Sequence, residues 1–129
     1  MKISKFNDLL NASKMQDQPQ RLLFLFAKAT SLPNAVMTKH HSGTIDPVMC
    51  VDKLPDGVVS FSTLLDEADS ISTKWDFVFI GCLDGNAGLP PSSEDAGPYL
   101  KMMTNDLASG KNISKYIVFD RMENHVILA

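Results

Sequence analysis

Two short stretches of the chain are apolar at almost every position, and they constrain the fold more than any other feature. One lies within residues 21–29 and contains Leu22-Leu23-Phe24-Leu25-Phe26-Ala27; the other, residues 75–83, contains Phe77-Val78-Phe79-Ile80. A strand with one face in water alternates apolar and polar residues, whereas a strand covered on both faces is apolar throughout. The two stretches therefore predict interior strands of a sheet with helices on both faces.

Three segments carry apolar residues at helical spacing. These segments are residues 6–13, 61–71 and 98–109. Ser4 is placed to cap the first helix, Ser60 the second, and Ser92 or Ser93 the third. Pro98 disturbs the start at Ser92 or Ser93, so residues 98–109 are the firmest part of the third helix, and Gly110 is a suitable C-terminal stop. On the second helix the apolar stripe is expected to face the core and its acidic residues to face water.

Shorter strands are expected at residues 48–51, 113–120 and 125–128. Only four residues separate the last two, so they form a hairpin, whereas the strands that flank helices suit parallel crossovers. The sequence thus predicts a single α/β domain over residues 1–129, with α+β as the alternative. It would contain a mixed sheet of about five strands, three helices and a C-terminal hairpin at the sheet edge.

Composition and charge exclude several classes of protein. The chain has 129 residues, of which 44% are hydrophobic and 21% charged, as in an ordinary globular domain. Its net charge is −3 and no basic stripe occurs, which argues against nucleic-acid binding. No apolar run reaches the roughly 18 residues of a membrane span, and the polar N-terminal residues do not resemble a signal peptide. We therefore expect a cytoplasmic protein.

The two cysteines, Cys50 and Cys82, each lie within an apolar run. In a reducing compartment this placement predicts two buried free thiols, and a disulfide would require adjacent strands in register. Neither residue has a neighbour in sequence that would activate it as a nucleophile.

Polar residues follow the ends of the predicted strands. In a parallel sheet these ends meet at one edge, where a small polar ligand could bind. The alternative is that strands simply end in exposed polar loops. The candidate ligand-binding residues are Lys28, Asp52, Lys53, Asp84 and Asn86.

Residues 31–47 predict a long loop, and they contain the only histidine pair, His40 and His41. A loop of this length in a small domain is often functional, so both histidines are candidate ligand-binding residues. Adjacent histidines on a strand point to opposite sides and rarely share a metal ion. The sequence therefore predicts no metal site and no cofactor.

The C-terminal strand and the Met102–Met103 pair are candidates for a partner surface. An exposed strand edge associates readily, and methionine adapts to varied partners. The last strand could pair across a two-fold axis, so a homodimer is one expected arrangement.

Four segments of the chain carry a resemblance to a known family, and they are residues 19–24, 47–53, 75–79 and 116–121. They resemble a family of short bacterial cytosolic proteins that has no established activity. The resemblance spans most of the chain and is weakest between residues 31 and 46. Some members carry the label "ribonucleotide reductase subunit alpha", but that enzyme needs a far longer chain, a radical-forming cysteine and a redox cysteine pair. The resemblance implies a shared fold and a bacterial cytosolic origin, and it brings no catalytic residues.

No catalytic motif can be assembled from the sequence. We therefore interpret the chain as a non-catalytic binding or accessory module that acts through the sheet edge or the long loop. The alternative is a small enzyme or ligand sensor with a polar site at the strand ends, near Asp52, Lys53 and Asp84. The partner, whether a protein or a small molecule, is not identified by the sequence.

Overall fold

One antiparallel sheet organises the described part of the chain. The computed structural model describes residues 3–30, 44–110 and 113–127. Within these residues five strands lie side by side in the order β2-β1-β3-β4-β5, and every neighbouring pair is antiparallel. The strands are β1 (Gln20–Thr30), β2 (Thr44–Lys53), β3 (Phe77–Asp84), β4 (Ile117–Asp120) and β5 (His125–Val126).

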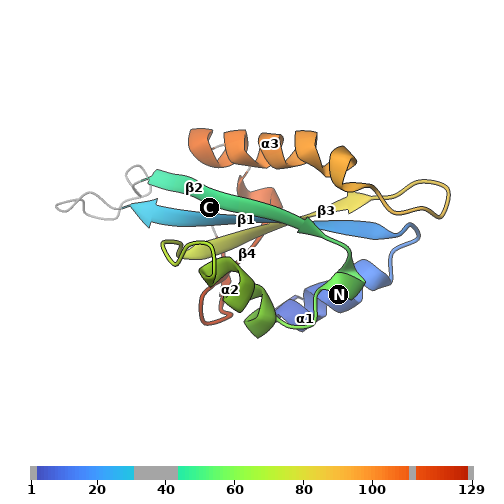
Figure 1. The fold of residues 1–129 in the computed structure, drawn as a ribbon, viewed down its shortest axis with the longest axis horizontal. Helices are drawn as coiled ribbons and strands as arrows, with labels where there is room; N and C mark the ends of the chain where they lie inside the picture. The colour runs from blue at the N-terminus through green and yellow to red at the C-terminus, as the bar shows by residue number, and fades with distance from the viewer. Residues whose placement is uncertain (1–2, 31–43, 111–112, 128–129) are drawn as a thin grey trace.

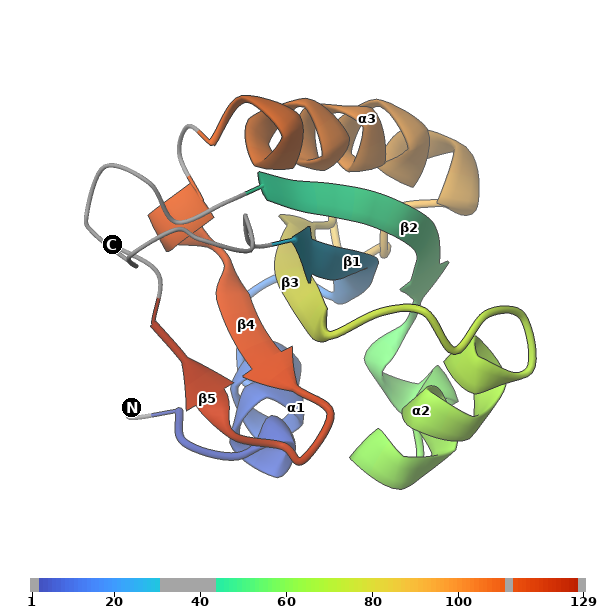
Figure 2. The same ribbon diagram turned by 90° about the vertical axis from the view of Figure 1, so that its left-hand side faces the viewer.

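Helices cover both faces of this sheet. Figure 2 shows α3 (Ser93–Ser109) on one side and α1 (Phe6–Lys14) with α2 (Phe61–Asp69) on the other. Two short 3₁₀ turns, η1 (Pro55–Gly57) and η2 (Ile113–Lys115), precede α2 and β4. The fold is therefore of the α+β kind, with one sheet between two helical layers.

The prediction of a mixed sheet with parallel neighbours is wrong. The helix α2 does connect two strands that run in the same direction, β2 and β3, but β1 lies between them and is antiparallel to both. The strand–helix–strand pattern predicts that β2 and β3 run in the same direction. Whether they are neighbours in the sheet depends on the position of β1, which the local sequence does not specify. The antiparallel hairpin at the sheet edge, β4–β5, is confirmed.

The prediction that the two apolar stretches are interior strands is confirmed. Six consecutive residues of β1, from Leu22 to Ala27, are buried, as are Val78, Phe79 and Ile80 of β3. Alternate side chains of β1 enter two separate cores, with Phe24 on the α1–α2 side and Leu25 on the α3 side. Continuous apolarity is what a strand between two helical layers requires.

Several predicted boundaries need correction. The strand predicted at residues 48–51 extends over all of β2, so part of the predicted long loop is strand, while residues 31–43 lie outside the described residues. The predicted strand 113–120 begins with a 3₁₀ turn. Ile71, expected in the core, lies beyond α2 with 74% of its surface exposed.

The caps predicted at Ser60 and Gly110 are present, whereas the prediction of Ser4 as the cap of the first helix is wrong, because the N-cap of α1 is Lys5. Ser60 Oγ accepts a hydrogen bond from Thr63 N at 3.1 Å, and Gly110 ends α3 in the left-handed conformation with φ of 71°. The predicted cap at Ser92 is confirmed: Ser92 and Asp95 form a reciprocal capping box, and Pro98 is accommodated inside α3 and does not delay its start. Its early start brings α3 over β2, where the candidate sites lie.

Candidate functional site

The antiparallel sheet divides the predicted strand-end residues between two ends of the molecule. Lys28 pairs with Asp46 at one end of β1, whereas Asp52 and Asp84 pair with β1 residues at the other end. Lys28 is therefore not brought together with the other candidates. His40 and His41 lie outside the described residues.

Two of the gathered residues are engaged in ion pairs. Asp52 accepts hydrogen bonds from Arg21 Nη1 at 2.7 Å and from Ser93 Oγ at 2.8 Å, and the Asp52 and Arg21 side chains are each only 16% exposed. Lys53 Nζ lies 2.9 Å from the carboxylate of Glu67 on α2. These contacts tie β2 to both helical layers, so the two charges are already neutralised by neighbours.

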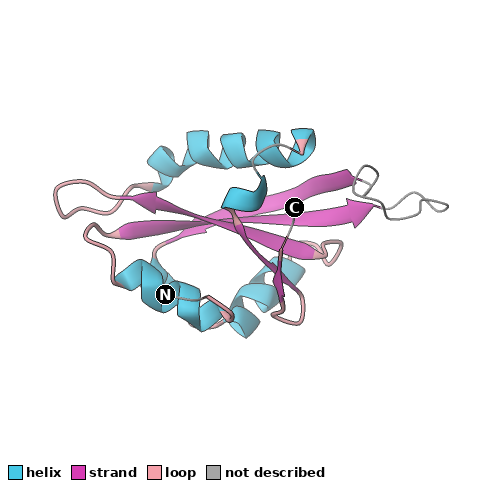
Figure 3. Cartoon of the chain, turned by 180° about the vertical axis from the view of Figure 1, so that it is seen from behind, coloured by secondary structure: helices cyan, strands magenta, loops and turns pink. Residues whose placement is uncertain are grey.

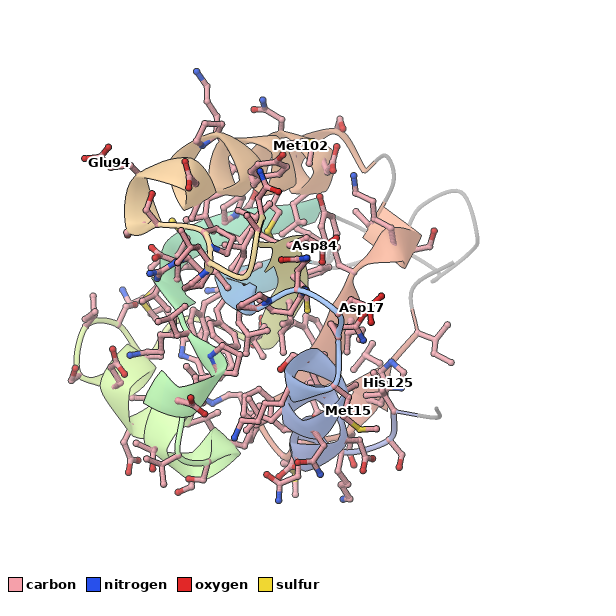
Figure 4. All side chains as sticks on the ribbon, turned by 90° about the vertical axis from the view of Figure 1, so that its right-hand side faces the viewer. Met15, Asp17, Asp84, Glu94, Met102 and His125 are labelled. Atoms are coloured by element: carbon pink, nitrogen blue, oxygen red, sulfur yellow. The ribbon has the colours of Figure 1, made fainter. Side chains whose placement is uncertain are left out.

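The other two residues, Asp84 and Asn86, lie at an open hollow beside the loop from β3 to α3. The hollow has a volume of about 730 Å³, and its lining also includes Leu89, Glu94 and Tyr99. Figure 4 looks at this end of the molecule, with Asp84 near the centre and Glu94 on the first turn of α3. Wide opening to solvent distinguishes this hollow from the enclosed clefts that bind most small molecules.

Backbone contacts hold the base of that loop. Gly85 N donates to Pro19 O at 2.7 Å. A Cβ atom at residue 85 would lie 2.1 Å from Leu89 O and 2.7 Å from Pro19 O, so only glycine fits. Asp84 accepts a hydrogen bond from Gln20 Nε2 at 2.6 Å, and Gln20 is buried. The contacts of Gly85 and Asp84 stabilise the loop itself.

The acidic residues at the start of α3 also act on the helix. Hydrogen bonds from the backbone and side chain of Ser92 lower the pKa of Asp95 below its ordinary value of 3.8. A carboxylate at a helix N-terminus is stabilised by the free N–H groups of the first turn. The capping role of Asp95 accounts for its position without a bound cation.

A second hollow, the β2–α2 groove, lies along the sheet edge. It has a volume of about 100 Å³, and apolar side chains provide most of its surface. Glu67 lies at its rim. We define the groove by six residues of its lining, which are Met49, Cys50, Val51, Leu64, Ala68 and Ile71.

The edge beside this groove is the outer side of β2, the first strand of the sheet. Figure 1 looks onto this edge, with α3 above β2 and α2 below it. The register with β1 shifts between Phe26 and Ala27, whose partners are Met49 and Pro47, so Val48 is a bulged residue. A bulge and a proline are devices that guard a strand edge against pairing. Residues 49–53 follow the bulge in regular register and carry neither device.

Backbone directions follow from hydrogen bonds on the far side of β1. Ala27 O accepts from Asp76 N at 2.8 Å, and Pro19 O accepts from Gly85 N at 2.7 Å, so both carbonyls point toward β3. Alternate residues of a strand direct their backbone groups to opposite neighbours. The odd-numbered residues of β1 therefore face β3, and the even-numbered residues from 20 to 26 face β2.

The same alternation assigns the free backbone groups of β2. The even-numbered β1 residues are in register with Met49, Val51 and Lys53, whose N–H and C=O groups consequently face β1. The backbone groups of Cys50 and Asp52 point away from β1. The edge strand thus presents two residues with N–H and C=O directed outward, next to an apolar groove.

The prediction of two buried thiols is wrong. Cys50 and Cys82 are both free and both exposed. They lie on β2 and β3, which β1 separates, so they are not placed for a disulfide. Cys50 lies on the edge strand β2, where residues 45–53 are half-buried or exposed, and Cys82 follows the buried residues 78–80 of β3. Partial burial of the thiol and, secondarily, the negative charge of Asp84 raise the pKa of Cys82 above its ordinary value of 9.0.

Two further searches covered only the described residues. Among them, no group of three or more His, Cys, Asp or Glu side chains is placed to hold a metal ion. No helix in residues 3–30, 44–110 and 113–127 is long and apolar enough to cross a membrane.

No protein-family model, no curated protein sequence and no solved structure matches this chain. Its function is therefore argued from its own geometry. Sequence reasoning missed the β2–α2 groove because the groove exists only if β2 is the edge strand. Pro47 was the one available signal, since proline inside a strand favours an edge position.

Proposed function

We propose that this protein is a non-catalytic binding module that accepts an extended segment of a protein partner along residues 49–53 of β2. One observation carries this proposal: a stretch of strand edge without a proline or a bulge lies directly beside an apolar groove. Recognition by strand addition needs both parts, because backbone hydrogen bonds supply affinity and a pocket for alternate side chains supplies specificity.

The guarded half of the same strand supports this interpretation. Pro47 and the bulge at Val48 stop an incoming strand from pairing with the first half of β2. Residues 47–48 thus disfavour strand pairing, whereas residues 49–53 have neither a proline nor a bulge. This pattern is expected of an edge that pairs with another strand in one defined register.

A catalytic or sensing role at the polar strand ends has weaker support. Arg21 and Ser93 already bind Asp52, and Glu67 binds Lys53, so these charges would have to leave existing partners before meeting a ligand. The hollow at Asp84 and Asn86 is wide open, and an active site usually excludes water.

Site-specific photo-crosslinking tests the proposal at two exposed positions. A photoreactive residue replaces either Ile71, at the groove, or Ile127, near β5; the two side chains are 74% and 84% exposed. In cells that contain the full-length protein, we expect a defined crosslinked product from position 71 and none from position 127.

The dependence on strand pairing is tested by a matched pair of variants. The N–H of Cys50 points away from β1, so Cys50→Pro removes a donor for the incoming strand and spares the β1–β2 ladder. The product from position 71 should vanish in Cys50→Pro and persist in Cys50→Ser. A product that survives Cys50→Pro, or that forms equally at both positions, contradicts the proposal.

A further inference from the structure

The segment that pairs with β2 can be identified from the charges along the edge. We propose that it is β2 of a second copy of this chain, in a two-fold symmetric dimer centred on Val51. This inference rests on the proposed function, because it assigns a partner to the same edge. Antiparallel pairing about a two-fold axis requires the edge to be complementary to itself.

Only one two-fold register pairs all of residues 49–53 with the same five residues of the partner. Centred on Val51, residues 49–53 pair with the same five residues of the partner, and neither Pro47 nor the bulged Val48 is included. Centred on Cys50, the pairing would run into that bulge and would set Lys53 opposite the partner's Pro47. Centred on Asp52, two carboxylates would lie directly opposite each other, which is unfavourable.

Charge also favours the Val51-centred register. Asp52 lies opposite the partner's Cys50, and Lys53 lies opposite the partner's Met49, so no like charges meet. Arg21 neutralises Asp52 and Glu67 neutralises Lys53 within each copy, which lowers the cost of bringing the two edges together. A self-pairing edge therefore needs no charged complement from a different protein.

The backbone directions agree with this register. Cys50 and Asp52 carry the outward-facing groups, and the register pairs each with the other across the two-fold axis. Each such pair exchanges two hydrogen bonds, so about four backbone bonds join the copies. Val51 and the partner's Val51 then form the close, non-bonded type of pair, in which side chains contact each other most directly.

The partner's Val51 side chain lies on the same face of the sheet as the β2–α2 groove. Met49 and Val51 belong to the core on the α1–α2 side, so the partner's Val51 also enters that side. The groove of about 100 Å³ lies there, between β2 and α2. Ile71 is exposed at the rim of the groove, and the two-fold symmetric dimer covers it on both copies.

Charge variants at Cys50 test the register on the purified full-length protein. Residue 50 of each copy lies opposite Asp52 of the other copy, so the pair occurs two times in the dimer. Cys50→Glu should therefore weaken the self-association constant, measured by sedimentation equilibrium, by roughly two- to thirty-fold. Cys50→Lys, which places a cation opposite Asp52, should leave the dimer intact or strengthen it. Thermal melts of both variants check that they still fold.

A chemical crosslink gives a second readout. In Cys82→Ser the only thiol is Cys50, and the two copies of Cys50 are diagonal neighbours, about 7–8 Å apart between Cα atoms. A short bis-maleimide should therefore join two Cys82→Ser chains and should not join two Cys50→Ser chains. Monomers at every concentration, equal effects of Glu and Lys, or absence of the Cys50 crosslink would each overturn the dimer.

Failure of the dimer is distinguishable from failure of the proposed function. If the purified chain stays monomeric while position 71 crosslinks in cells to a different protein, and Cys50→Pro abolishes that product, then β2 is a binding edge with another partner. If position 71 yields no product in cells either, both proposals fail.

Discussion

The outer edge of β2 belongs to a strand of 10 residues and lies beside a groove, whereas at the opposite edge β5 contributes 2 residues. Figure 3 shows the β5 side of the molecule in front. There the turn from β4 to β5 forms many internal contacts. Asp120 accepts from Met122 N and Asn124 N, and Glu123 accepts from Phe6 N at the start of α1. The polar groups of the turn beside β5 are thus bonded within the chain, whereas among the described residues no hydrogen bond engages the outward backbone groups of Cys50 and Asp52.

This difference bears on the dimer expected from sequence. The C-terminal strand was the candidate for two-fold pairing, but a two-residue strand offers few backbone bonds. The edge at β2 is longer and has an adjacent apolar groove. An exposed strand edge is therefore a candidate interface only when its length and surroundings support pairing.

The largest predicted effect concerns the groove itself. Leu64 lines the β2–α2 groove and is 2% exposed, so Leu64→Ala should lower the free energy of unfolding by about 2–5 kcal/mol through the cavity it leaves. The matched change Leu65→Ala, at a half-buried position on the same helix, should cost clearly less. Denaturant melts measure both, and equal losses would show that the face of α2 is wrongly assigned.

Proline substitutions distinguish the residues of β2 whose N–H groups face β1 from those whose N–H groups point away from it. Val51 N faces β1, so Val51→Pro removes a ladder hydrogen bond and leaves an acceptor on β1 unpaired. Its cost should exceed that of Cys50→Pro by roughly 1–3 kcal/mol. Melting of the two variants as monomers gives the difference. The opposite ranking would reverse the assignment of outward-facing residues.

On the β5 side the turn should contribute less stability. Arg121 donates to both carboxylate oxygens of Asp69, at 2.8 and 2.7 Å, and stacks on Trp75 with 4.1 Å to the ring centroid. Because the pair is about one-third exposed, Arg121→Met should cost only roughly 1 kcal/mol. Lys14→Met, which breaks a more exposed pair with Asp56, should have almost no effect on unfolding.

The smallest predicted effect is a pH dependence at the start of α3, beside β2. The folded-state pKa of Asp95 is below 3.8, mainly because the backbone and side chain of Ser92 donate hydrogen bonds to it. Its stabilising contribution is therefore complete above pH 3.8 and is lost as the pH falls through the lowered value. Asp95→Asn should flatten the acid branch of the stability curve slightly. An unchanged acid branch would contradict the capping role.

Local features of the sequence predicted the elements well, and long-range features were missed. The interior position of Phe24 and Val78 and the cap at Ser60 follow from neighbours a few residues away. The exposure of Cys50 depends instead on β2 being an edge strand, and the separation of Lys28 from Asp84 depends on strand direction. Strand order and strand direction both arise from packing between segments that are distant in the sequence.

Hydrogen exchange at Cys50 and Asp52 tests most directly whether β2 is a pairing edge. The account predicts that these two amides exchange quickly when the purified protein is dilute and slow down as its concentration rises. The amides of Met49 and Val51, already bonded to β1, should change much less. Rapid exchange at Cys50 and Asp52 at every concentration, with or without the partner found by crosslinking, would contradict it.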